Sequence, residues 1–467
     1  MKLELKDKQV LVLGLGDTGL SALRWLARQG AVLSAADTRN NPPGIDMLRN
    51  ELPQVKMHTG AFRSVMFEHA DLIVISPGVP LSTPEIQTAV TRGKPVVGDV
   101  ELFAQQIAGS AQYSQTKIIG ITGANGKTTV TTLVGEMCKA AGLKTIVAGN
   151  IGLPVLDILS MDVPDVVVLE LSSFQLETTH SLNAAAAVVL NVTEDHMDRY
   201  ASFAEYAAAK ERIFAHALVK VVNREDAYSS SMGSSTIGNL GAIKVSFGLN
   251  IPSNNEDFGL LTQAGVTYLA QGTTRLLPLT EMKLNGLHNA ANALAALALC
   301  RAIGLDYPPL FNILKTFKGL PHRVEWVANI HDIDFYDDSK GTNVGATCAA
   351  IAGMTKNSAA QKVVLIAGGD GKGQDFSPLL QALENNARAA VLIGRDAPTI
   401  EQALAASTIP RYLAADLLEA VNIAYKVAHK GDAVLLSPAC ASFDMFKNYV
   451  HRAEVFVAAV KKLEAMT

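Results

Sequence analysis

Short runs of consecutive apolar residues alternate with longer segments of helical length along most of the chain. The runs are apolar at every position rather than at every second one, which is typical of strands covered on both faces. They are residues 9–14, 71–76, 117–122, 165–170, 186–191, 362–368, 389–394 and 433–437. Segments of helical length between them, such as 20–30 and 128–142, end at a glycine. This order of strand, helix and strand predicts an α/β fold with mainly parallel sheets.

Two polar segments interrupt the alternation and predict domain boundaries. Residues 109–115 (GSAQYSQ) precede a new strand, and residues 319–323 (GLPHR) precede a new series of strands. We expect hinges at both segments. The three expected domains are residues 1–108, 109–320 and 321–467. The segments 229–241 and 251–259 are rich in Ser, Asn and Gly, and they predict surface loops between short strands.

The composition is that of a globular chain, with 49% hydrophobic and 18% charged residues among 467. A formal net charge of -4 argues against a general nucleic-acid-binding surface. The four cysteines form no C-x-x-C pair, which favours a reducing cytosol over a disulfide framework or a zinc knuckle. The N-terminus lacks the long apolar region of a secretory signal, and no apolar run approaches the roughly 18 residues of a membrane span. We therefore expect a cytoplasmic protein with no nucleic-acid or membrane partner.

Residues 117–134 (KIIGITGANGKTTVTTLV) lead from a strand through a glycine turn into a helix. Such a turn directs backbone N–H groups and the positive end of a helix dipole at a phosphate. Gly123 and Gly126 would let the backbone approach the anion. Lys127 would reach the terminal phosphates, and the Thr128 hydroxyl would bind Mg2+. The first glycine of the general G-x-x-x-x-G-K-[ST] pattern is an isoleucine here, and the alternative is a glycine-rich turn with a solvated lysine.

Two polar side chains follow buried strands on the same side of the predicted central sheet. Glu170 ends the run 165–170, and His196 lies in NVTEDHMDRY (191–200), just after another run. Ligand sites of parallel sheets collect at the carboxyl ends of the strands. A carboxylate there can hold Mg2+ directly or through water. The alternatives are a solvated acid and a structural histidine, but the expected proximity to Lys127 favours a functional site.

The N-terminal segment contains a second glycine turn between strand and helix. Gly14, Gly16 and Gly19 form a G-x-G-x-x-G pattern, and Asp37 ends the next apolar run. This is the dinucleotide fingerprint, with an acid for a ribose hydroxyl. Taken alone it argues for NAD, but the same geometry binds any nucleotide diphosphate, including a UDP-sugar. A glycine-rich turn without a ligand is the remaining alternative.

Eight blocks, in the same order along all three expected domains, together resemble the Mur ligases. They are TGANGKTT (122–129), ELSSFQLE (170–177), NVTEDHMDRY (191–200), HNAANA (288–293), GLPHR (319–323), DSKGTN (338–343), GGDGK (368–372) and SPACASFD (437–444). The ELSSFQL block and the glycine-rich N-terminal domain are similar to the branch of the family that adds D-glutamate.

The resemblance implies a Rossmann-like N-terminal domain for a UDP-sugar, a P-loop ATPase-like central domain and a Rossmann-like C-terminal domain for an amino acid. It implies ATP-dependent addition of D-glutamate to UDP-N-acetylmuramoyl-L-alanine in cytoplasmic peptidoglycan synthesis. The γ-phosphoryl group of ATP would pass to the acceptor carboxylate, and the amine of D-glutamate would displace phosphate from the acyl phosphate. We expect the enzyme to be a monomer.

The resemblance also implies two Mg2+ ions and makes Lys127, His196 and Lys210 the catalytic residues. Lys210 matches a helix lysine that carries CO2 as a carbamate in the family. A carbamate would turn this cation into an anionic oxygen ligand for Mg2+. From the residues alone, Lys210 is an ordinary solvated helix lysine. The implied metal ligands are Thr128, Glu170, His196 and carbamylated Lys210.

The family motifs imply three sets of binding residues. For ATP they are Gly123, Asn125, Gly126, Lys127, Thr128, Thr129, Asn292, Arg323 and Asp338. For the UDP-sugar they are Gly14, Gly16, Thr18, Gly19, Asp37, Thr38, Arg39, Ser76, Gly78, Asn150 and Ser172. For D-glutamate they are Thr342, Lys372, Ser442 and Tyr449, the last through its backbone amide because the family often has Phe there. Without the family, Lys372 could equally be a mobile surface lysine in its glycine-flanked loop.

Three rival hypotheses remain at this point. An NAD-dependent oxidoreductase would explain the first glycine turn but leaves the GKT turn and the third domain without a role. A non-catalytic nucleotide sensor would explain both turns without a reaction. Within the ligases, the runner-up is a sister enzyme for a different amino acid.

Overall fold

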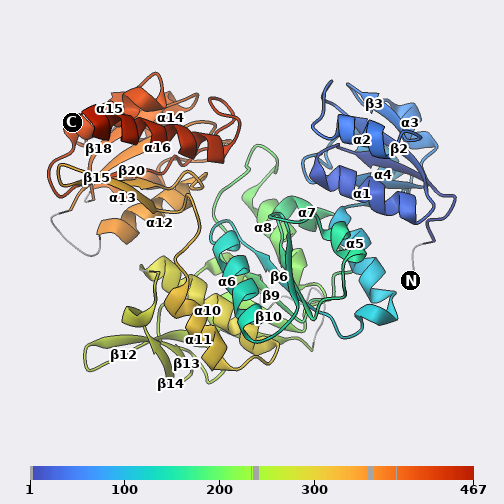
Figure 1. Ribbon diagram of the computed structural model, residues 1–467, viewed down its shortest axis with the longest axis horizontal. Helices are drawn as coiled ribbons and strands as arrows, with labels where there is room; N and C mark the ends of the chain where they lie inside the picture. The colour runs from blue at the N-terminus through green and yellow to red at the C-terminus, as the bar shows by residue number, and fades with distance from the viewer. Residues whose placement is uncertain are drawn as a thin grey trace. The chain divides into compact units, whose positions relative to one another are not determined.

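The computed structural model describes residues 4–232, 234, 241–284, 286–355, 361–384 and 386–466. The described strands form three sheets, which follow one another along the chain (Figure 1). The chain divides into two compact units. The first comprises Met1–Val192, Ala204–Met282 and Ala291–Thr316, and the second comprises Thr193–Phe203, Lys283–Ala290 and Phe317–Thr467.

The N-terminal part of the first unit contains a five-stranded sheet in the order β3-β2-β1-β4-β5, with every pair parallel. Its strands are β1 (Gln9–Leu13), β2 (Val32–Asp37), β3 (Lys56–Thr59), β4 (Leu72–Ile75) and β5 (Val96–Val97). Its helices are α1 (Asp17–Arg28), α2 (Ile45–Glu51), α3 (Ser64–Glu68), α4 (Pro84–Thr91) and α5 (Asp99–Ala108). The order reverses at β1, so the carboxyl ends of β1 and β4 form the switch point where such sheets bind ligands.

The rest of the first unit is built on a nine-stranded sheet in the order β14-β13-β12-β11-β10-β9-β6-β8-β7. Its strands are β6 (Lys117–Thr122), β7 (Thr145–Gly149), β8 (Val166–Glu170), β9 (Ala186–Val189), β10 (Val219–Asn223), β11 (Ile243–Phe247), β12 (Phe258–Gln263), β13 (Val266–Gln271) and β14 (Thr274–Pro278). Only the pairs β12–β13 and β13–β14 are antiparallel among the described strands of this sheet. The helices are α6 (Lys127–Ala140), α7 (Ser173–Glu177), α8 (Phe203–Glu211), α9 (Ala227–Met232), α10 (Leu287–Ala302) and α11 (Tyr307–Thr316).

The second unit contains a six-stranded sheet in the order β15-β16-β20-β17-β18-β19, parallel except for the β15–β16 pair. Its strands are β15 (Glu325–Ile330), β16 (Ile333–Asp337), β17 (Val363–Gly368), β18 (Ala387–Ile393), β19 (Arg411–Leu413) and β20 (Ala433–Leu436). Buried residues of α15 (Leu417–Val427) and α16 (Tyr449–Met466) pack on one face. Those of α12 (Val344–Thr355), α13 (Pro378–Glu384) and α14 (Ala397–Ala403) pack on the other, so helices cover both faces (Figure 1).

These three sheets confirm the expected α/β architecture, and each expected apolar run coincides or overlaps with a strand. Residues 117–122, for example, coincide with β6. The loop expected over 229–241 is wrong at its start, because Ser229 and its neighbours belong to α9. Asp226 accepts the Ser229 N–H, and the Ser229 hydroxyl donates to Val189, so the helix is held against the sheet. Residue 233 and residues 235–240 of this segment lie outside the described residues, among which no helix is long and apolar enough to cross a membrane.

Candidate active site

The glycine turn between β6 and α6 has the conformation that its sequence predicts. Gly123 and Gly126 have φ angles of +155° and +83°, a region that favours glycine. Helix α6 begins directly after Gly126, so its positive end faces the turn. The Lys127 ammonium bends back over the turn and donates to the carbonyl oxygens of Gly123 (2.8 Å) and Ala124 (2.9 Å). The turn therefore has a backbone that suits a phosphate loop, with the lysine at the turn.

Asn191 holds this loop and was missed as a site residue by the sequence reasoning. Its side-chain oxygen accepts the Asn125 N–H (2.8 Å), and its Nδ2 donates to the Asn125 carbonyl (3.1 Å). The only signal in the sequence was its place at the start of the 191–200 block, directly after a buried strand.

Glu170 lies at the carboxyl end of β8, in parallel register with Ile121 of β6. Its side chain is 1% exposed. One carboxylate oxygen accepts from the Asn150 amide (2.8 Å), whereas Oε2 is buried and has no hydrogen-bond partner among the described residues. A buried carboxylate oxygen without a donor is costly unless a cation compensates it. The carboxylate therefore fits a Mg2+ ligand, and the alternative of a solvated acid is wrong.

Lys210, on the last turn of α8, is also buried. It is 2% exposed, so the expectation of an ordinary solvated lysine from the residues alone is wrong. Its ammonium donates to the Gly123 carbonyl (3.0 Å) and lies 4.5 Å from the centre of the Tyr206 ring. The side chain thus reaches the phosphate loop from a distant part of the sequence, which the helical pattern could not reveal.

Asn292, an expected ATP-binding residue on α10, belongs to the same unit. A β-carbon added to Gly126 would lie 2.6 Å from the Asn292 side-chain oxygen. The phosphate loop therefore packs against Asn292, and any larger residue at position 126 would collide with it.

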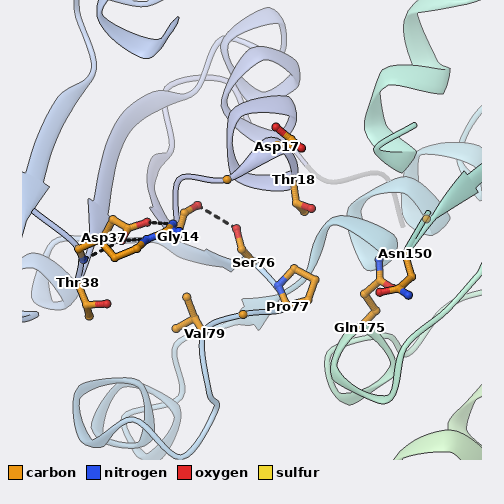
Figure 2. A pocket seen from close by; sticks show the side chains of 14 residues that line it. Gly14, Asp17, Thr18, Asp37, Thr38, Ser76, Pro77, Val79, Asn150 and Gln175 are labelled. Atoms are coloured by element: carbon orange, nitrogen blue, oxygen red, sulfur yellow. Dashed lines mark hydrogen bonds and ion pairs between the residues drawn. The ribbon is translucent and has the colours of Figure 1, made fainter. Parts of the chain in front are cut away.

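The N-terminal glycine turn opens into a cavity of about 530 Å³ (Figure 2). The cavity is lined by Gly14, Gly16, Asp17, Thr18, Asp37, Thr38, Arg39, Ser76, Pro77, Gly78, Val79, Gly149, Asn150 and Gln175. Most of the expected UDP-sugar residues are among them. Figure 2 shows Asn150 and Gln175 across the cavity from the turn. Because Asn150 also donates to Glu170, it connects the cavity to the candidate metal ligand.

Two expected UDP-sugar residues do not line this cavity. A β-carbon on Gly19 would lie 1.9 Å from the Gly14 carbonyl oxygen, so Gly19 serves the close packing of α1 on the turn. Ser172 caps α7 in a reciprocal capping box with Gln175. Gln175 lines the cavity in place of Ser172. The S-x-x-Q spacing of Ser172 and Gln175 is the sequence signal for the start of α7.

Asp37 is 2% exposed and already has several donors. Its carboxylate accepts from the backbone N–H groups of Leu15 (2.7 Å) and Arg39 (2.9 Å) and from the Arg39 guanidinium. Burial alone would raise the pKa of Asp37, but the hydrogen bonds from Arg39 and Leu15 outweigh it and lower the pKa to about 2. Asp37 therefore shapes the rim of the cavity by fixing the 37–39 loop.

His196 and Lys372 lie in the second unit, where residues 193–203 join the C-terminal domain. The Lys372 ammonium forms an ion pair with Asp195, and both side chains are about nine-tenths buried, with 10% and 9% exposed. Asn343 also donates to Asp195 (3.3 Å). The alternative of a mobile surface lysine at position 372 is therefore wrong. Asp195 directly precedes His196, so this ion pair anchors the segment that carries the histidine.

The other expected D-glutamate residues follow neighbouring strands of the same sheet. Thr342 follows β16, Lys372 follows β17 and Ser442 follows β20, and these strands are adjacent and parallel. Ser442 is buried and Thr342 is half-buried. Tyr449 begins α16, and the Lys340 ammonium lies 4.0 Å from the centre of its ring. These residues thus share the carboxyl edge of the C-terminal sheet.

Asp338, an expected ATP-binding residue, directly follows β16 at the same edge of the sheet and is 5% exposed. Its carboxylate accepts from the Ser437 hydroxyl (2.6 Å). Burial raises the pKa of Asp338 to about 7, against that hydrogen bond and the nearby positive charge of Arg323. Arg323 and Asp338 are therefore close enough to interact, as two residues expected to bind one nucleotide should be.

Comparisons with known proteins agree with these two turns and three sheets. The N-terminal domain of MurD-like Mur ligases matches residues 8–98, the Mur ligase middle domain matches residues 121–300, and the Mur ligase glutamate ligase domain matches residues 322–440.

Full-length relatives have the same organisation. The chain is 59% identical over 462 residues to the UDP-N-acetylmuramoylalanine–D-glutamate ligase of Methylobacillus flagellatus, covering 99% of this chain and 98% of that protein. It is 55% identical over 477 residues to the protein of the same name from Thiobacillus denitrificans, covering 99% and 98%. A solved UDP-N-acetylmuramate–alanine ligase from Thermotoga maritima shares the fold, with 20% identity, a TM-score of 0.60 and coverage of 97% and 99%.

The glycine turn with Lys127 and the buried Glu170 carboxylate fits an ATP-binding site, and the three matching domains make the chain an ATP-dependent ligase. The chain belongs to the Mur ligase family, and the full-length relatives named above are D-glutamate ligases of that family. The oxidoreductase and nucleotide-sensor hypotheses are thereby excluded.

Proposed function

We propose that this enzyme joins D-glutamate to UDP-N-acetylmuramoyl-L-alanine, using ATP, in cytoplasmic peptidoglycan synthesis. The observation that carries the proposal is the 59% identity, over 99% of the chain, to a relative named for these substrates. The location follows from the substrates, since ATP and nucleotide sugars are cytoplasmic compounds. Because the residues proposed for all three substrates belong to one chain, we propose that the enzyme acts as a monomer.

We assign the UDP-sugar to the cavity of the 1–108 domain. The pyrophosphate would lie on the turn at Gly14 and Gly16, near the first turn of α1, where backbone N–H groups favour an anion. The 37–39 loop, fixed by the Asp37–Arg39 hydrogen bonds, would bind the uracil. Asn150 and Gln175 would bind the sugar or its alanine arm from the far side of the cavity.

We assign ATP to the 109–320 domain, with its phosphates on the loop of Gly123, Asn125, Gly126, Lys127, Thr128 and Thr129. Lys127 already lies at this loop and would move its ammonium onto the transferred phosphoryl group. The buried Glu170 oxygen, the Thr128 hydroxyl and His196 would hold two Mg2+ ions, which neutralise phosphate charge when bound. By the family motifs, Asn292 of this domain and Arg323 and Asp338 of the 321–467 domain would bind the nucleotide itself.

We propose that Lys210 carries a carbamate in the active enzyme. The support is its position: a 2%-exposed side chain whose nitrogen is 3.0 Å from the phosphate-loop carbonyl of Gly123. A bare ammonium beside a magnesium site would repel the cation, whereas a carbamate would add an oxygen ligand.

We assign D-glutamate to the 321–467 domain, at the carboxyl edge that carries Thr342, Lys372 and Ser442. The substrate has two carboxylates and needs a cation and hydroxyl donors, which this edge supplies. Its amine would attack the acyl phosphate, and the tetrahedral intermediate would collapse to an amide and phosphate.

The experiment that tests the proposal is a panel of amino acids assayed for ADP release with UDP-N-acetylmuramoyl-L-alanine. We expect release with D-glutamate and at most a few per cent of that rate with L-glutamate, L-alanine, L-lysine or meso-diaminopimelate. Release driven by another amino acid, with D-glutamate inactive, would identify a sister ligase instead.

A further inference from the structure

The side-chain amide of Asn191 is matched to the backbone of the phosphate loop. Its Oδ1 accepts the Asn125 N–H at 2.8 Å, and its Nδ2 donates to the Asn125 carbonyl at 3.1 Å. Its own carbonyl accepts the Ala124 N–H at 3.0 Å. We infer that Asn191 is a positioning residue for ATP binding, which fixes the loop in its phosphate-binding conformation. This inference rests on the proposed function of the loop.

Residues 190 and 191 also form the surface on which the loop lies. A β-carbon on Gly123 would lie 3.0 Å from the Leu190 β-carbon and 3.4 Å from the backbone nitrogen and oxygen of Asn191. One on Gly126 would lie 3.5 Å from a Leu190 methyl carbon. The two glycines that give the loop its backbone conformation therefore also allow it to pack on this strand end.

The strand end itself is fixed from behind, so Asn191 has a rigid base. The Leu190 N–H donates to the Thr122 carbonyl (2.9 Å), and the Leu190 carbonyl accepts from the Asn223 amide (3.0 Å). On the other side of Asn191, the Val192 N–H donates to the Asp226 carboxylate (3.0 Å). A side chain held on both sides can hold the loop in one conformation.

The consequence for ATP is preorganisation. With the Ala124 and Asn125 amides already bonded to Asn191, the loop cannot rotate them, and the amides at the start of α6 keep a fixed direction toward a phosphate. Without Asn191 the loop would have to be ordered on binding, which weakens affinity. The two side-chain hydrogen bonds correspond to roughly a 10- to 30-fold change in ATP affinity.

The test compares Asn191→Ala with Asn386→Ala. Both side chains are half-buried amides. The Asn386 amide donates to the Ala382 carbonyl (2.9 Å) of α13 in the second unit, so its loss leaves the loop and the strand end behind it intact. We expect the Kd for Mg·ATP to rise about 10- to 30-fold in Asn191→Ala and less than about 3-fold in Asn386→Ala, with the Kd for UDP-N-acetylmuramoyl-L-alanine unchanged in both. Amide hydrogen exchange in the ligand-free enzyme should be faster at residues 124–125 only in the Asn191 variant.

Asn191→Asp is a second variant of nearly the same shape, for the case that the alanine variant does not fold. It keeps the acceptor for the Asn125 N–H but loses the donor, so both ATP affinity and loop protection should fall. Normal ATP affinity in a folded Asn191 variant, or equal effects of Asn191→Ala and Asn386→Ala, would overturn the inference. Lys127→Ala tests the proposed function of the loop separately from the role of Asn191. If this variant also binds ATP normally, the proposed function of the loop fails as well.

Discussion

At the scale of single residues, burial singles out the proposed site residues more than sequence pattern does. Glu170 and Lys210 are 1% and 2% exposed, and Lys372 is paired with a buried aspartate. The motif positions of Glu170 and Lys127 were predictable from strand ends and a glycine turn. The burial of Lys210 was not, because it depends on the contact between α8 and a loop formed more than eighty residues earlier. Gln175 and Asn191 were missed for the same reason.

Lys210→Ala should lower the ligase activity roughly 100-fold or more, because it would remove the proposed ligand from a site that balances phosphate charge. If the ligand is a carbamate, added formate or acetate should restore part of the activity by supplying the missing oxygens. The measurement is kcat with and without about 0.1 M formate or acetate at constant ionic strength.

Lys127→Ala is the matched control for this rescue, because Lys127 acts as a cation at the same loop. It should lose activity to a similar degree and gain nothing from carboxylates. Rescue of both variants, or of neither while both remain folded, would argue against a carbamate on Lys210.

Asp99 at the start of α5 gives a pH prediction. Burial raises the pKa of Asp99 to about 6 from its ordinary value of 3.8, and no residue in the described part of the chain hydrogen-bonds to its buried Oδ1. The folded state therefore holds this proton more tightly than the unfolded state, and stability falls as pH rises from about 4 to about 6. Asp99→Asn should remove this loss, raising the free energy of unfolding by roughly 1 kcal/mol more at pH 7.5 than at pH 5.

Denaturant unfolding of Asp99→Asn and the parent enzyme at the two pH values makes this measurement. An equal change in the free energy of unfolding at both pH values would mean that Asp99 is ionised at pH 5 in the folded protein, contrary to the prediction.

At the scale of elements, the strands were the most predictable part of the molecule. Runs that are apolar at every position predict strands covered on both faces, and β6 coincides with its run. Only the start of segment 229–241 was misassigned: Ser and Gly favour loops, whereas here a buried serine and the Asp226 carboxylate hold a helix start. The glycine pattern of the first turn was recognised, but its glycines have different roles that only packing distances reveal.

Gly19→Ala and Gly16→Ala should separate these roles. A β-carbon at Gly19 would meet the Gly14 carbonyl oxygen at 1.9 Å, so α1 would have to move, at a cost of roughly 1–3 kcal/mol. At Gly16, apart from its chain neighbours, no atom of the residues that the structure describes lies within 4 Å of an added β-carbon, so stability should be nearly unchanged. Thermal unfolding should therefore show a lowered Tm for Gly19→Ala only.

Gly16 nevertheless lines the cavity, so its added methyl group should weaken UDP-sugar binding without destabilising the fold. Similar Tm values for the two variants would contradict the packing role of Gly19.

At the scale of the whole molecule, the chain combines two glycine turns of the kind that bind nucleotides with a third sheet. No single motif predicts the ligand of that third sheet. The first two sheets belong to one compact unit, and Asn150 connects the first cavity to Glu170 beside the phosphate loop. The second unit carries Lys372 and the segment of His196, anchored together by Asp195. The sequence predicted these three modules, but not that residues 193–203 would group with the C-terminal one. Local patterns do not report which unit a loop packs on.

The central claim is that the energy of ATP is transferred to the acceptor carboxylate as an acyl phosphate before the amide forms. The most direct measurement uses UDP-N-acetylmuramoyl-L-alanine labelled with 18O in its carboxylate, D-glutamate and unlabelled ATP. If the carboxylate attacks the γ-phosphoryl group, one labelled oxygen must leave with phosphate, so mass spectrometry should find a single 18O in each phosphate released. Amide formation with only unlabelled phosphate would contradict this account.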